Sequence, residues 1–226
     1  MKHLVILASK SPRRKEILQD LGFQIRVFHS NIKEVCDSSS QTLEDKVISI
    51  ARKKAGAVTA EIDGRFPKEI ILASDTVVCL GDEIFGKPSN REEAYQMLMK
   101  LAGKKHTVIT ATVILDNNRA LSYEVASKTI VKFKPLSEEV IREYLDKNEY
   151  MDKAGAYGIQ SNGDRLVNYI HGDYFNVMGL SVTTVVEYFK KYYNEEISTT
   201  KLLKKHESLI RKFKSDGDND EQTFFK

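Results

Sequence analysis

Short apolar runs alternate with amphipathic segments along this chain, a pattern typical of α/β proteins. The first run, Leu4–Ala8, predicts a buried strand because it is short, apolar and rich in β-forming residues. Ser11 and Pro12 come next and predict a helix start, with Ser11 as the N-cap and Pro12 at the first helical position. Gly22 suits the position after a last turn, so we expect this helix over residues 12–21.

The same patterns predict the remaining elements. Strands are expected over residues 23–28, 70–73, 77–80, 108–115 and 121–133. Helical spacing and capping residues predict helices from Thr42 through residue 58 and over residues 91–101, 135–145 and 181–193. Gly81 and Asp82 predict a turn, residues 83–88 a loop, and residues 153–173 form a glycine-punctuated stretch.

The end of the chain differs from the rest. Residues 195–214 predict an amphipathic helix with its apolar side chains on one face. Residues 215–221 are acidic and rich in turn formers, which predicts disorder. We therefore expect one domain over residues 1–194 and a C-terminal appendage over residues 195–226, helical at first and then disordered.

Composition narrows the class of protein. The length of 226 residues and a hydrophobic content of 41% suit one α/β domain with a real core. A net charge of +3 is too small to indicate nucleic-acid binding, and no apolar stretch reaches membrane-spanning length. The two cysteines lack CxxC spacing, which argues against a disulfide framework or a zinc site. We expect a cytoplasmic protein that binds neither nucleic acid nor membrane.

Arginines occupy the first turn of the predicted 12–21 helix. Arg13 and Arg14 are unfavourable there, because the helix dipole already places partial positive charge at that end. Backbone N–H groups, the hydroxyls of Ser9 and Ser11 and two guanidinium groups would together bind a polyanion such as phosphate. The plain alternative is that these cations are merely solvated. Their position after a strand favours a site, because open α/β folds bind ligands there.

Two acids are candidates for chemistry. Asp75 directly follows the predicted strand 70–73, where a carboxylate can act as a metal ligand or a general base. An Asx turn is the alternative for Asp75. Glu34 lies in the polar segment after the second strand, and a solvated role is its default.

Three further residues complete the candidate site. Lys54 lies on a basic helix face that solvent alone would explain, and Lys87 projects from a loop between a glycine and a proline. Gln160 follows Gly155 and Gly158, and its amide could pair with the imide edge of uracil or thymine unless this is only a structural loop. The chain has no P-loop motif and no GxGxxG.

Taken together, these segments resemble the Maf family of nucleoside triphosphate pyrophosphatases. The resemblance is carried by residues 9–14 (SKSPRR), 51–55 (ARKKA), 73–77 (ASDTV), 86–88 (GKP) and 152–160 (DKAGAYGIQ). Residues 171–179 (HGDYFNVMG) look like the eukaryotic members of that family. Ser74 departs from the glycine or alanine that often precedes the aspartate, and we expect little consequence from this small residue.

The resemblance implies a fold, a reaction and roles for residues. The fold would be a mixed twisted sheet with flanking helices and two lobes around a central cleft, similar to the inosine-triphosphatase fold and often dimeric. The reaction would be Mg²⁺- or Mn²⁺-dependent hydrolysis of a nucleoside triphosphate to the monophosphate and pyrophosphate. Asp75 would be the proton acceptor and, with Glu34, a metal ligand. Phosphate contacts would come from Ser9, Arg13, Arg14, Lys54 and Lys87, and base preference from Arg13, Thr76 and Gln160.

The resemblance favours the subgroup that acts on dTTP and UTP, with modified pyrimidine triphosphates as possible further substrates. Two other functions stay open: a nucleotide-binding regulator of cell division without turnover, and a purine enzyme acting on ITP or XTP. The Asp75 carboxylate argues against the first, because mere binding needs no base. Gln160 and the segment 11–13 weigh against the second.

Overall fold

The computed structural model describes residues 3–29, 32, 42–62, 65, 69–147, 149–160 and 162–213. The chain divides into two compact units. Unit 1 comprises Met1–Asp75, Thr110–Ser127 and Gly179–Lys205, and unit 2 comprises Thr76–Ile109, Lys128–Met178 and His206–Lys226. Strands β3 (Ile70–Leu80), β5 (Lys105–Asp116) and β6 (Leu121–Phe133) contribute residues to both units.

Among the described residues, seven strands form one sheet with the order β2-β1-β3-β5-β6-β7, and β4 pairs with β3. Strand β1 (Leu4–Ala8) is parallel to both β2 (Gln24–Phe28) and β3, whereas the β3–β4 and β6–β7 pairs are antiparallel. The sheet is therefore mixed, which confirms the predicted fold class. No helix in the described part of the chain is both long and apolar enough to cross a membrane.

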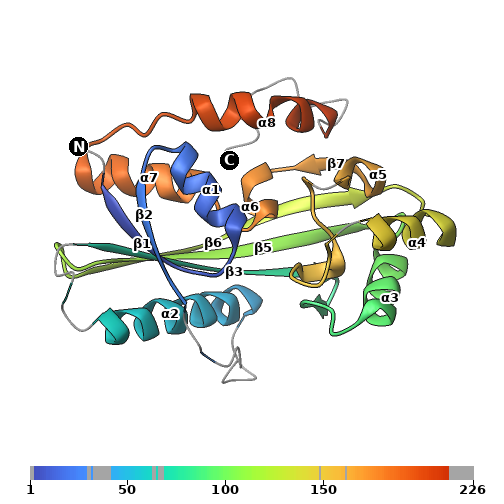
Figure 1. Cartoon of the computed structure of the whole chain (residues 1–226), viewed down its shortest axis with the longest axis horizontal. Helices are drawn as coiled ribbons and strands as arrows, with labels where there is room; N and C mark the ends of the chain where they lie inside the picture. Colours follow the sequence, from blue (N-terminus) through green and yellow to red (C-terminus); the bar gives the residue numbers. More distant parts are fainter. Residues whose placement is uncertain are drawn as a thin grey trace. The chain divides into compact units, whose positions relative to one another are not determined.

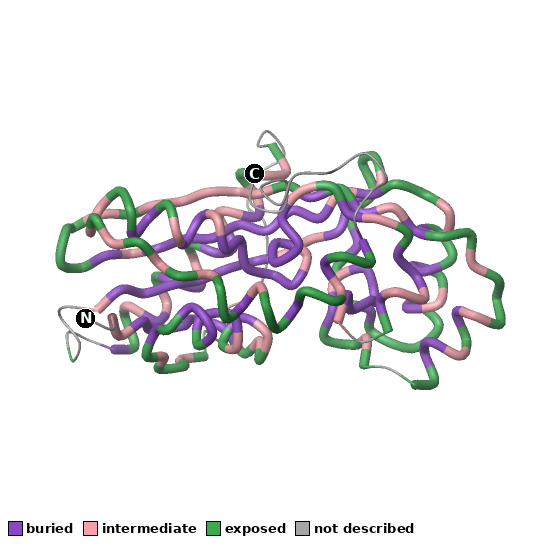
Figure 2. Tube along the Cα trace, turned by 90° about the horizontal axis from the view of Figure 1, so that it is seen from above, coloured by how far each residue is buried: buried purple, intermediate pink, exposed green. Residues whose placement is uncertain are grey.

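In unit 1, helices cover both faces of the strands. Helices α1 (Pro12–Asp20) and α7 (Val182–Tyr193) lie on one face and α2 (Leu43–Ile62) on the other (Figure 1). Because β1 is covered on both faces, its last four residues are buried, as expected for a continuous apolar run in a parallel pair. Figure 2 shows buried residues along the strands and exposed residues at the turns.

Unit 2 contains the shorter elements. Strand β4 (Glu83–Phe85) forms a hairpin with the end of β3, and β7 (Val167–His171) pairs with β6. Helix α3 (Arg91–Leu101) packs against α4 (Glu138–Lys147) and the 3₁₀ turn η1 (Ala154–Ala156). Helices α5 (Gly163–Leu166) and α6 (Tyr174–Met178) flank β7, and α8 (Thr200–Lys212) begins in unit 1 and ends in unit 2.

Local signals placed most helix ends correctly. Thr42 and Asp45 cap α2 reciprocally, the Asn90 side chain accepts from the Glu93 N–H at 2.8 Å, and Ser181 caps α7. Gly22 follows the last turn of α1 with φ +93°, the left-handed conformation that glycine adopts without strain. The predicted helices at these positions are confirmed.

Strand β3 is the main difference from the sequence prediction. A break was expected at residues 74–76, but the strand runs unbroken from Ile70 to Leu80. Both polar side chains find buried partners: Ser74 Oγ donates to the Gly179 carbonyl at 2.8 Å, and Asp75 pairs with Lys54. Polar residues with partners on their own faces of the sheet do not need to leave it.

Candidate functional site

The turn from β1 into α1 presents hydroxyl and N–H donors, as the sequence predicts. Ser11 occupies the N-cap position, but its side chain makes no capping bond. Its backbone N–H instead donates to Ser9 Oγ at 3.2 Å. The first turn of α1 holds no acidic residue. The helix start therefore keeps its positive character, which suits an anion.

The two arginines of this turn have different environments. Arg13 is partly exposed, whereas Arg14 is buried, with 9% of its surface accessible. Arg14 Nε donates to the Gly179 carbonyl at 2.7 Å, and its Nη1 donates to Ser9 Oγ at 3.0 Å and to the Ser74 carbonyl at 2.8 Å. Three of the five donors of this guanidinium thus go to protein acceptors.

Asp75 and Lys54 form the central charged pair of unit 1. Lys54 Nζ lies 2.5 Å from Asp75 Oδ1, and the two side chains are only 10–11% exposed. Lys54 shares the core-facing side of α2 with Ala51 and Val58, at helical spacing. It is therefore not one of the solvated cations of α2, in contrast to Arg52, which pairs with Glu124 near the surface.

The predicted site residues fall into three groups: those in unit 2, those in unit 1 and one outside the described residues. Thr76, Lys87 and Gln160 belong to unit 2, where Thr76 follows Asp75 within β3, Lys87 is exposed after β4, and Gln160 is partly exposed. Ser9, Arg13, Arg14, Lys54 and Asp75 belong to unit 1. Glu34 lies outside the described residues.

The segment that leads to Gln160 needs its glycines. Gly155 has φ +68°, and a Cβ there would lie 3.1 Å from the Val78 side chain. A Cβ at Gly158 would lie 2.8 Å from Cε of Lys153, which is itself buried. Close approach of the backbone to β3 and to a lysine stem therefore explains the glycine density.

Buried tyrosines anchor this segment. The Tyr144 hydroxyl, on α4, accepts from the Gly158 N–H at 2.9 Å. The Tyr157 hydroxyl lies 2.9 Å from His106 Nε2, and both rings pack edge-on against Phe133. Burial lowers the pKa of His106 to about 4 and raises the pKa of Tyr157, so both side chains are neutral at pH 7.

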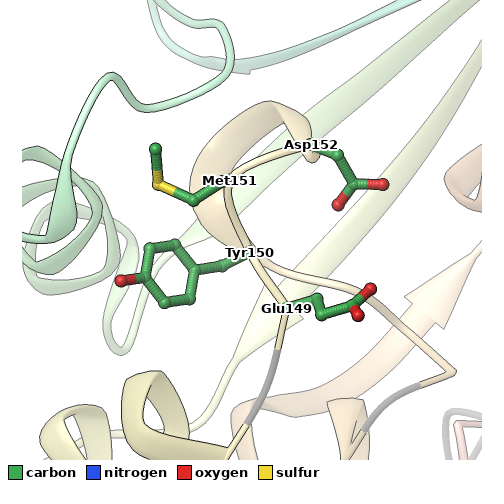
Figure 3. Close-up of a pocket in the computed structure, with 4 residues that line it drawn as sticks. All are labelled: Glu149, Tyr150, Met151 and Asp152. Carbon is green, nitrogen blue, oxygen red and sulfur yellow. The ribbon is translucent and has the colours of Figure 1, made fainter.

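A separate pocket of about 280 Å³ lies just before this segment in unit 2. Its lining residues are Glu149, Tyr150, Met151 and Asp152 (Figure 3). Tyr150 and Met151 project to one side of the backbone, and the two carboxylates project to the other. It contains none of the predicted site residues.

The described side chains fit a divalent metal that is bound partly by substrate phosphates better than a metal that is bound by protein ligands alone. Among the described residues, no group of three or more His, Cys, Asp or Glu side chains could hold a metal ion. Mg²⁺ in phosphate-transfer sites usually keeps several waters and takes one or two carboxylates plus substrate oxygens. Asp75 can supply one such carboxylate.

The mixed sheet with its flanking helices defines an α/β protein, and its unit 1 holds both the basic start of α1 and the buried Lys54–Asp75 pair. The chain belongs to the Maf-like protein family, whose family model matches residues 4–192. Helix α8 lies beyond the matched range.

Three relatives are dTTP/UTP pyrophosphatases by name. The protein of Pyrococcus abyssi is 45% identical over 187 residues, which cover 83% of this chain and 95% of the relative. That of Fusobacterium nucleatum is 43% identical and covers 83% and 94%, and that of Bacillus velezensis is 42% identical and covers 85% and 98%. The solved Staphylococcus aureus Ham1 protein is 9% identical, covers 57% of this chain and 71% of that chain, and gives a TM-score of 0.38.

Sequence reasoning missed the residues that support the site. Tyr144 and His106 carried no local signal, because their partners Gly158 and Tyr157 lie 14 and 51 residues away in the chain. Ser74 was expected to have little consequence, yet its hydroxyl holds the Gly179 carbonyl. A buried serine beside a candidate catalytic acid was the available signal, since buried hydroxyls need partners.

Proposed function

We propose that this protein hydrolyses dTTP and UTP to the nucleoside monophosphate and pyrophosphate. The relatives' names support the substrate class. The observation that carries the proposal is the buried Lys54–Asp75 pair in unit 1, in which Asp75 lies within strand β3 and Lys54 lies on helix α2. A protein that only bound nucleotide would not need a buried carboxylate close to an anion site.

In this proposal the cations bind the triphosphate from several directions. Arg13, Lys54, Lys87 and the Ser9 hydroxyl contact phosphate oxygens, because charge-assisted hydrogen bonds are the strong ones for such an anion. Arg14 differs from these residues, since three of its donors already bond protein acceptors. Thr76, Gln160 and Arg13 set the base preference.

Asp75 is proposed to accept the proton of the attacking water. Lys54 holds Oδ1 of that carboxylate at 2.5 Å, which fixes its orientation. Oδ2 is the oxygen proposed to take the proton, since a general base must lie within hydrogen-bond reach of the proton that it takes. Lys54 then serves both the base and the phosphates.

A divalent cation, Mg²⁺ or Mn²⁺, is part of the proposal. Such an ion would offset phosphate charge and lower the pKa of a bound water. Asp75 would hold it, with Glu34 as the second carboxylate. We also propose a homodimer in the cytoplasm that acts without nucleic acid or membrane.

A panel of nucleoside triphosphates with pyrophosphate detection tests the proposal. We expect dTTP and UTP to be hydrolysed much faster than ATP, GTP and CTP. Fastest release from ITP or XTP would identify a purine enzyme instead. Tight nucleotide binding without pyrophosphate release from any substrate would identify a non-catalytic regulator.

A further inference from the structure

The consecutive residues Arg13 and Arg14 point in different directions and cannot make the same contacts. Neighbouring residues of an α-helix point about 100° apart, since the helix has 3.6 residues per turn. Arg13 accordingly stays partly exposed, whereas Arg14 turns inward and is 9% exposed. The inward guanidinium meets acceptors from three segments of unit 1: Ser9, Ser74 and Gly179.

The Gly179 carbonyl is the centre of this arrangement. It accepts from Arg14 Nε at 2.7 Å and from Ser74 Oγ at 2.8 Å, so both of its lone pairs are used. Gly179 has φ +106°, a conformation that favours glycine. One backbone oxygen therefore ties helix α1 to strand β3.

Arg14 also fixes the peptide that precedes Asp75. Its Nη1 donates to the carbonyl of Ser74, and that carbonyl belongs to the peptide group whose nitrogen is Asp75 N. Side chains alternate along a strand, so Ser74 faces the α1 side while Asp75 faces Lys54 on α2. The orientation of the Asp75 carboxylate thus depends on contacts on both faces of β3.

Arg14 also holds the Ser9 hydroxyl. Its Oγ accepts from Arg14 Nη1 at 3.0 Å and from the Ser11 N–H at 3.2 Å. A hydroxyl that accepts two hydrogen bonds retains its own O–H as a donor. An anion is the matching partner for that donor.

We propose that Arg14 is a positioning residue: it holds the peptide before Asp75 and the Ser9 hydroxyl in their working geometry, while Arg13 contacts the phosphates. This inference rests on the proposed hydrolysis. The two arginines should therefore differ in kinetics: a change at Arg14 should lower kcat, and a change at Arg13 should weaken phosphate binding.

Arg14→Lys tests it, with Lys15→Arg on the exposed side of the same helix as the matched control. A lysine keeps the charge but lacks the planar fork that reaches three acceptors. We expect Arg14→Lys to lower kcat by about 10- to 100-fold, the effect of a small misplacement of reacting groups. The inhibition constant of pyrophosphate should change by less than about threefold, because Arg14 does not hold the leaving group. Lys15→Arg should leave kcat and pyrophosphate inhibition at their wild-type values, whereas Arg13→Gln should weaken pyrophosphate inhibition by about tenfold or more.

Two results would overturn the inference: Arg14→Lys with wild-type kcat, or Arg14→Lys with weakened pyrophosphate inhibition and unchanged kcat. If Arg14→Lys does not fold, Arg14→Gln decides, because an uncharged amide can donate to only some of the three acceptors that Arg14 holds. A fall in kcat at constant KM then supports the inference, and an unchanged kcat overturns it. The measurements use whichever triphosphate the wild-type protein hydrolyses best, so failure on dTTP and UTP would count against the proposed function alone.

Discussion

At the scale of single residues, the site depends on how buried charges are paired. The Lys54–Asp75 pair is close to fully buried, and removing one partner from such a pair leaves an uncompensated charge in a medium of low polarity. The choice of substitution therefore decides what an experiment reports. Asparagine at position 75 keeps an oxygen for the Lys54 ammonium, whereas alanine would leave that ammonium without it.

Asp75→Asn should lower turnover by about 10²–10⁴-fold, the usual contribution of a general base. Nucleotide binding should stay close to that of the wild type, because the phosphate-binding cations remain. Steady-state kinetics with UTP and calorimetric binding of a non-hydrolysable analogue measure the two quantities. Asp82→Asn, in the exposed β3–β4 turn, is the matched control. Hydrolysis by Asp75→Asn at the wild-type rate would remove Asp75 from the role of base.

Gln160→Ala should narrow the difference in kcat/KM between UTP and CTP. An amide held in one orientation can donate to and accept from the imide edge of uracil, and cytosine presents the reversed pattern. A site built on such hydrogen bonds rejects a mismatched partner, because buried polar groups are left unpaired. An unchanged ratio of kcat/KM for the two nucleotides would exclude Gln160 from base selection.

At the scale of elements, what the sequence could predict depended on how local the cause was. Caps and helical spacing are local, so α1, α2, α3 and α7 were found close to their observed ends. The unbroken course of β3 depends on Lys54 and Gly179, which lie 21 and 105 residues from their partners. Strand β4 has only three residues, and its pairing with β3 is what defines it.

For the candidate site too, features with a local cause could be predicted from the sequence and features with a distant cause could not. The residue types and the helix start could be predicted, because hydroxyls, arginines and an N-cap occur together in the chain. The pairing of Lys54 with Asp75 and the burial of Arg14 could not, because both arise from packing between distant segments. Helix α6 did carry a missed local signal: the Asp173 carboxylate accepts from the N–H groups of Phe175 and Asn176.

Tyr144→Phe tests how the Gln160 segment is held. The variant removes only the hydroxyl that accepts from the Gly158 N–H, and it leaves that N–H buried without this acceptor. We expect the UTP-to-CTP ratio of kcat/KM to fall while inhibition by pyrophosphate is unchanged. Tyr150→Phe, in the separate pocket, is the control. An unchanged ratio would show that the segment keeps Gln160 in place without this bond.

Helix α8 behaves as a docked element. Leu202 and Phe213 are buried, and Lys205 pairs with both Asp20 and Glu16 on α1. Burial alone would raise the pKa of Asp20, but hydrogen bonds from Lys201 and Lys205 outweigh it and lower the pKa. In unit 2, the Ile170 N–H donates to the Phe213 carbonyl at 2.9 Å.

Truncation after Asn194 should therefore destabilise the protein while the matched motifs remain. The truncation removes Leu202 and Phe213, and the burial of each such side chain contributes about 1.5–3 kcal/mol. For a chain of this size, each kcal/mol corresponds to about 2–4 °C in Tm, so a fall of more than about 5 °C is expected by calorimetry. Hydrolysis measured well below the new Tm should persist. An unchanged Tm would show that α8 adds nothing to stability.

At the scale of the whole molecule, His106 should make unfolding depend on pH. Burial lowers its pKa from the ordinary histidine value of 6.5 to about 4, so the folded protein resists protonation that the unfolded chain accepts. Between pH 4 and 6.5 the unfolded state therefore binds more protons than the folded state. The free energy of unfolding must rise with pH across this window, and the stability is fully present above pH 6.5.

The stability lost from pH 6.5 down to pH 4 through this one group is up to about 3 kcal/mol. Urea denaturation at pH 7.0, 6.0 and 5.0 measures it, with His106→Gln as the comparison. Glutamine keeps a hydrogen-bonding group near the Tyr157 hydroxyl and cannot titrate in this range. We expect the wild type to lose more stability than the variant as the pH falls, because only the wild type has the imidazole of His106. The difference between the two slopes of unfolding free energy against pH isolates His106 from the other histidines. Parallel slopes would mean that His106 is protonated as readily in the folded protein as in the unfolded chain.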